Sequence, residues 1–155
     1  MDLKELILKS KNIFTEKAPY IDQQKFIIVQ PSKQLLYLII NNSVNSIYNI
    51  STSKYGLGNK NESFQTPVGV HYIAKKIGDN VAKNTIFKGR KIFLDNLTIN
   101  DLDKSEYSNI RQKYFKDNED IITSRIMWLK GHEIGINLGG DVDSYSRYIY
   151  IHGTI

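Results

Sequence analysis

The chain has 155 residues, of which 41% are hydrophobic and 24% are charged, proportions that exclude a disordered or membrane-spanning chain. Its net charge of +5 arises from 21 basic and 16 acidic residues that are scattered along the sequence, so we expect no nucleic-acid partner. The chain contains no cysteine, which excludes disulfides and thiolate metal sites and leaves the redox compartment open.

Residues 1–24 are predicted to form an N-terminal helical segment. The apolar residues that recur near one helical face are Leu3, Leu6, Ile7, Ile13 and Phe14. Charged residues interrupt this segment, so it lacks the continuous apolar run of a secretory signal. No stretch of the sequence reaches the length of a transmembrane helix. We therefore expect a cytoplasmic chain without a membrane span.

Three short strands are predicted next. Residues 25–30 and 34–40 are apolar runs separated by a turn, which is typical of a hairpin. Asn41 and Asn42 tolerate positive φ and predict a second tight turn, which leads into a strand over residues 44–51. The sequence therefore predicts a three-stranded meander.

The middle of the chain alternates between loops and strands. Residues 52–65 are rich in Gly, Asn, Ser and Lys and are expected to form a long surface loop. Residues 70–74 predict a strand that ends at the turn 78–80. The lysine-rich stretch 83–91 is interpreted as a solvated loop.

One interior helix and two further strands are predicted in the last third. Residues 97–117 favour a helix, with Asn100 or Asp101 as the N-cap. Residues 121–129 indicate a buried strand, a glycine-rich excursion covers 131–143, and 148–152 read as a terminal strand. The fold class that follows is mostly β with peripheral helices.

His152, at the end of the terminal strand, has two interpretations from the residues alone. It is either a structural histidine or a general base, the usual role of histidine near neutral pH, and Gly153 would permit close approach to the backbone. Tyr148 and Tyr150 fall on one face of this strand as core or rim residues.

Other chemistries are less well supported. The three histidines of the chain, His71, His132 and His152, match no metal-ligand spacing, so we expect no metal site. Ser124 and Ser144 lie in no nucleophile-elbow pattern, and no cofactor-binding fingerprint is present.

Several stretches resemble the L,D-transpeptidase catalytic domain of the YkuD family. They are residues 51–58, 65–73, 89–90, 123–129, 131–135 and 143–154. The resemblance implies a β-sandwich-like domain over residues 25–155, and its last block is the most specific.

The family signature is a histidine followed further along by a Ser/Thr-His-Gly-Cys segment, and His152 matches the first histidine. The resemblance implies attack of a cysteine thiolate on the carbonyl between diaminopimelate and D-alanine in a peptidoglycan stem peptide. The second half of the signature has no counterpart here. We therefore expect a domain that is incomplete at its C-terminus and inactive for want of its nucleophile.

The resemblance also implies roles for single residues. His152 would activate the thiol, and the Gly153 carbonyl would orient its imidazole. Tyr148 and Tyr150 would line the cleft, and Arg125 would hold a substrate carboxylate.

Two alternatives to a wall-crosslinking enzyme stay open. Intact relatives without an export signal would act as cytoplasmic L,D-carboxypeptidases in muropeptide recycling, whereas wall-crosslinking members work outside the cytoplasmic membrane. A non-catalytic module that binds a muropeptide or a protein is the other alternative. The expected partner of the domain is therefore a peptidoglycan stem peptide or muropeptide.

Overall fold

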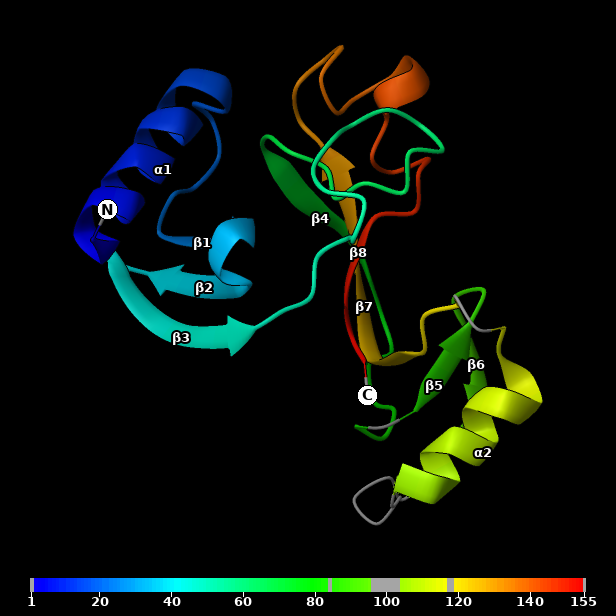
Figure 1. Cartoon of the computed structure of the whole chain (residues 1–155). Helices are drawn as coiled ribbons and strands as arrows, with labels where there is room; N and C mark the ends of the chain where they lie inside the picture. The colour runs from blue at the N-terminus through cyan, green and yellow to red at the C-terminus, as the bar shows by residue number, and fades with distance from the viewer. Residues whose placement is uncertain (1, 84, 96–103, 117–118, 155) are drawn as a thin grey trace. The chain divides into compact units, whose positions relative to one another are not determined.

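The computed structural model describes residues 2–83, 85–95, 104–116 and 119–154 (Figure 1). The chain divides into two compact units. The first comprises Met1–Tyr72 and Lys130–Arg147, and the second comprises Ile73–Leu129 and Tyr148–Ile155.

The first unit contains a helix packed on a three-stranded sheet. Helix α1 (Leu3–Lys17) begins where the side chain of Asp2 accepts a hydrogen bond from the Glu5 amide at 2.8 Å, which caps the helix. Figure 1 shows α1 in blue beside the cyan strands. The core between them consists of Ile7, Phe26, Ile28, Tyr37 and Ile39. The helix expected near the N-terminus is therefore confirmed.

Antiparallel pairing in the order β1-β2-β3 confirms the predicted meander. Its strands are β1 (Lys25–Gln30), β2 (Leu35–Ile40) and β3 (Ser43–Asn49). Asn41 and Asn42 adopt φ values of 49° and 64°, the left-handed conformation that the turn requires. The third strand ends at Asn49, two residues earlier than predicted.

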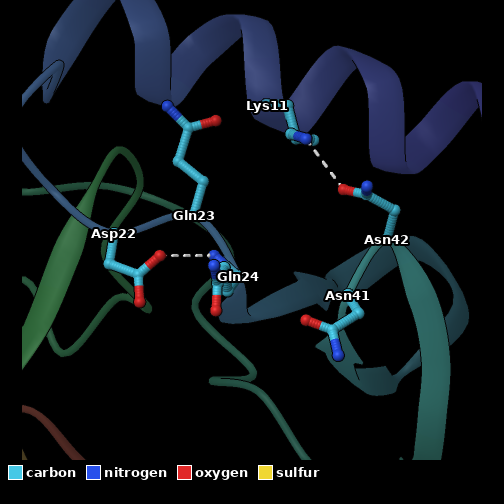
Figure 2. A pocket seen from close by; sticks show the side chains of 6 residues that line it. All are labelled: Lys11, Asp22, Gln23, Gln24, Asn41 and Asn42. Carbon is cyan, nitrogen blue, oxygen red and sulfur yellow. Dashed lines mark hydrogen bonds between the residues drawn. The ribbon is translucent and has the colours of Figure 1, made fainter.

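A polar pocket of about 300 Å³ lies in the first unit (Figure 2). Its lining residues are Lys11, Asp22, Gln23, Gln24, Asn41 and Asn42. Lys11 Nζ donates to Asn42 Oδ1 at 2.7 Å, and Asp22 accepts from the Gln24 amide at 2.8 Å. Both charged groups are thus hydrogen-bonded within the pocket, which contains none of the predicted site residues.

Asn137, which is completely buried, joins two loops of the first unit. Its Nδ2 donates to the carbonyls of Val68 and Val70 at 3.1 and 3.0 Å, and its Oδ1 accepts from the Glu133 amide at 2.9 Å. These bonds satisfy the Val68 carbonyl and the Glu133 amide, and they add a second donor to the Val70 carbonyl, which also accepts from the His132 amide. The long loops predicted over 52–65 and 131–143 are present, the second with a single 3₁₀ turn at Gly140–Val142.

Most residues of a five-stranded sheet belong to the second unit. Its strands are β4 (His71–Ile77), β5 (Ile86–Lys88), β6 (Lys91–Leu94), β7 (Ile122–Gly131) and β8 (Tyr150–Gly153). The order is β4-β7-β5-β6, and β8 also pairs with β7. Helix α2 (Lys104–Tyr114) leads into Phe115, which packs with Ile86 and Ile121.

Three sequence predictions need adjustment here. Residues 83–91 are not a simple loop, because Ile86–Leu94 form the β5–β6 hairpin around Gly89 and Arg90, whose φ values are 57° and 67°. The helix predicted over 97–117 is observed from Lys104 to Tyr114, and its predicted start and last residue lie outside the described residues. The terminal strand begins at Tyr150 instead of Tyr148, whose φ of 58° interrupts extended backbone.

The prediction of a mostly β chain with peripheral helices is confirmed for the described residues, which contain the two helices α1 and α2. None of the helices in the described ranges is long and apolar enough to cross a membrane. The predicted division into residues 1–24 and 25–155 stays a prediction.

Candidate functional site

His152 lies on β8 opposite Ile126 of β7. Its half-buried imidazole places Nδ1 2.9 Å from the Gly153 carbonyl oxygen. A carbonyl oxygen can only accept a hydrogen bond, so Nδ1 carries the proton and Nε2 carries the lone pair. Nε2 has no hydrogen-bond partner among the described residues. The imidazole is therefore held in the tautomer that a general base needs, with its basic nitrogen available.

His71, at the start of β4, has a similar arrangement at one nitrogen and a different one at the other. Its Nδ1 lies 3.0 Å from the Gly69 carbonyl, and its Nε2 lies 2.8 Å from Ser144 Oγ. Burial lowers the pKa of His71 below its ordinary value of 6.5, against smaller opposing effects of the Gly69 hydrogen bond and Glu133. The neutral ring thus accepts a hydrogen bond from the Ser144 hydroxyl.

Ser144 is completely buried, so this serine and His71 cannot meet a substrate as a nucleophile and base. The pair instead holds the start of β4 to the loop that carries Ser144. Within the described part of the chain, His71 is therefore a structural histidine, and His152 has the geometry of a reactive one.

Tyr150 and Tyr148 gather around Trp128 and Arg90. Tyr150 stands opposite Trp128 in the β7–β8 register, with ring centroids 5.5 Å apart, and the Tyr148 ring lies 5.6 Å from Trp128. The Arg90 guanidinium lies over the rings of Trp128 and Tyr148 at 5.0 and 4.7 Å. Its Nη1 donates to the Tyr150 hydroxyl at 3.2 Å. Arg90, which was not predicted as a site residue, thus contacts both of the predicted cleft tyrosines.

The sequence contained a signal for Arg90. Gly89 and Arg90 form one of the stretches that resemble the family, yet they lie inside the segment interpreted as a solvated loop. The tight turn between β5 and β6 places the arginine against the aromatic rings. Its hydrogen bond to Tyr150 raises the pKa of Arg90, so the guanidinium stays charged.

Arg125 lies in a β-bulge, where the register with β8 shifts between Thr123 and Ile126. Its side chain is exposed, and Nη1 donates to the Ser124 carbonyl at 2.5 Å. No carboxylate among the described residues pairs with it. Its predicted role in holding a substrate carboxylate stays a prediction.

Gly153 is required by the packing of β8 on β7. A methyl group at this position would lie 2.9 Å from both the carbonyl oxygen and Oγ1 of Thr123, and 3.2 Å from Ser124 Oγ. The sequence suggested that another group approaches the Gly153 backbone closely. In the structure, that group is strand β7 at Thr123 and Ser124. Because Gly153 also accepts the His152 hydrogen bond, this fit sets the position of the imidazole.

Comparison with known proteins gives one match. A family model described as YkuD, L,D-transpeptidase catalytic domain, matches residues 24–155. Neither the curated proteins nor the solved structures yielded a match. The matched range includes His152, Gly153 and the residues around Trp128.

Substitution Gly153→Ala tests the packing of β8. We expect the variant to lose about 1–3 kcal/mol of unfolding free energy, because the added methyl group overlaps Thr123. Urea denaturation measures this loss, and Thr154→Ala, at the exposed next position, is the matched control with little change. Equal stability of Gly153→Ala and the control would contradict the account.

The lowered pKa of His71 predicts a pH-dependent stability. Below about pH 6.5 an unfolded His71 takes up a proton that the folded ring resists, so the unfolded state binds more protons. Stability is therefore retained above that pH and lost as the pH falls toward the folded pKa. Unfolding free energies measured at neutral and mildly acidic pH should decrease more steeply for the wild type than for His71→Gln. Parallel slopes would show that this ring does not contribute.

Proposed function

Since the chain belongs to the YkuD family of L,D-transpeptidase catalytic domains, we propose that it recognises peptidoglycan stem peptides at the bond between diaminopimelate and D-alanine. With a thiol nucleophile, the reaction at this bond would be an acyl transfer. The observation that supports this most directly is His152, with Nδ1 fixed by the Gly153 carbonyl and Nε2 available on a strand within the matched range.

His152 is assigned the role of general base in this proposal. Nε2 would take the proton of an attacking thiol and return it to the amine of the departing D-alanine. The bond broken is the amide, and the bond formed is a thioester to the enzyme. Water or an amine would then release the acyl group, with carboxypeptidase or transpeptidase outcome respectively.

The thiol itself is not among these residues. The sequence contains no cysteine, so these 155 residues supply the base without the nucleophile. Loss of an essential nucleophile lowers the rate by several powers of ten, and retained binding does not restore it. We therefore propose that this polypeptide binds the stem peptide without cleaving it.

Tyr148, Tyr150 and Arg125 complete the proposal as substrate contacts. The two tyrosines flank Trp128, and Arg125 presents an exposed guanidinium that makes no ion pair among the described residues. The absence of cysteine also favours the second candidate function, a non-catalytic module that recognises muropeptides. Both candidates require the same binding surface.

A diaminopimelate-containing tetrapeptide is the substrate that tests the proposal. We expect the polypeptide to release D-alanine no faster than buffer does, and to bind the peptide saturably in a calorimetric titration. His152→Ala should weaken binding about tenfold, the effect of one lost hydrogen bond to a charged ligand.

His132→Ala is the matched control, because the His132 side chain makes no hydrogen bond among the described residues. This variant should bind the peptide as tightly as the wild type does. Release of D-alanine above the buffer rate would refute the absence of catalysis. Failure of the folded polypeptide to bind the peptide at all would refute the substrate assignment.

A further inference from the structure

The second unit contains a pocket of about 410 Å³, and its lining includes none of the residues assigned to the base or to substrate contact. Its lining residues are Lys75, Lys76, Ile77, Gly89, Arg90, Lys91 and Trp128. Four of them are cations, and none is acidic. They come from three separate segments of the chain, namely β4, the β5–β6 turn and β7. Folding therefore gathers positive charge that is scattered in the sequence.

The positive charge of the pocket is not neutralised by the protein. Lys75, Lys76 and Lys91 are exposed and have no ion-pair partner in the part of the chain that the structure describes. Arg90 is likewise held by the Tyr150 hydroxyl and two aromatic rings instead of by a carboxylate. Like charges repel, so grouping four cations without counter-charges favours an anionic ligand.

Arg90 gives the pocket a fixed donor as well as charge. The rings of Trp128 and Tyr148 lie against the guanidinium, and the bond to Tyr150 orients it. A guanidinium held in this way presents its remaining N–H groups in a planar fork that fits carboxylate and phosphate oxygens. The lysines add point charges that accept many ligand orientations.

The pocket also lies next to the candidate base on the sheet. Trp128 pairs with Tyr150, and Ile126 pairs with His152, so Tyr150 and His152 occupy successive positions on one face of β8. Two residues of a strand span about 7 Å. A ligand bound over Trp128 would thus extend toward His152.

We propose that this pocket binds a group with two or more negative charges on oxygen, such as a phosphate ester or a pair of carboxylates. Four cations exceed what one carboxylate neutralises, and the volume accommodates more than a single ion. The proposal goes beyond the proposed function, because none of the residues that received a role there lines the pocket.

Trp128 is the single tryptophan of the chain, so its fluorescence reports directly on the pocket. The wild-type polypeptide is titrated with glycerol 3-phosphate and with glutarate at low ionic strength. We expect at least one of them to cause a saturable change, and affinity to decrease as salt rises. Preference between the two identifies a phosphate or a dicarboxylate as the source of the charge.

The variant Lys75→Gln/Lys76→Gln/Lys91→Gln should bind at least tenfold more weakly. The matched control is Lys4→Gln/Lys33→Gln/Lys60→Gln, whose exposed lysines lie in the first unit and line neither pocket. Both variants lower the net charge of +5 by three. The control should bind within twofold of wild type.

Two results would overturn the proposal. One is the absence of saturable binding by either probe to the folded wild type. The other is an equal loss of affinity in the two triple variants, which would assign the effect to net charge. Arg90→Lys gives an independent check: it keeps the charge and removes the fork, and we expect it to weaken binding about threefold or more.

Discussion

The antiparallel pairing of β8 with β7 is the constraint on which the candidate site depends. This pairing places His152 opposite Ile126 and Tyr150 opposite Trp128. Gly153 permits this close pairing because it has no side chain to collide with Thr123. The bulge at Ser124 and Arg125 lets the two strands pair on both sides of a register shift. Packing at one glycine thus sets the position of His152 and of the aromatic cluster.

His71 and His152 make similar contacts with the backbone but differ in the partner of Nε2. Each directs Nδ1 toward a glycine carbonyl, which fixes the lone pair on Nε2. In His71 that lone pair is occupied by the buried hydroxyl of Ser144, whereas in His152 it has no partner among the described residues. Of these two histidines, only His152 therefore has an acceptor nitrogen without a partner among the described residues.

Local patterns in the sequence predicted much of the fold correctly. The amphipathic helix, the Asn41-Asn42 turn and the apolar run of β7 each depend on neighbouring residues, and all three are present. The β5–β6 hairpin was missed because its lysines suggested a solvated loop. Its strand character comes from pairing with β7, a contact between residues far apart in the sequence.

The candidate site was predictable from the sequence only where its residues lie in one contiguous motif. His152 and the two tyrosines could be selected by resemblance, since the motif is contiguous. Arg90 and the pocket of lysines could not be assembled from the sequence, because they come from segments that only the sheet brings together. The tautomer of His152 likewise follows from geometry and not from residue type.

In the proposed function, His152 presents the lone pair of Nε2 to a stem peptide. Nitrogen-15 NMR of the imidazole rings measures this directly, since it distinguishes the two tautomers and reports ligand contact at each nitrogen. We expect His152 as the Nδ1–H tautomer, with an Nε2 resonance that shifts saturably when the tetrapeptide is added, while His71 is unchanged. An Nε2–H tautomer at His152, or an Nε2 signal that does not respond to the peptide, would contradict the account.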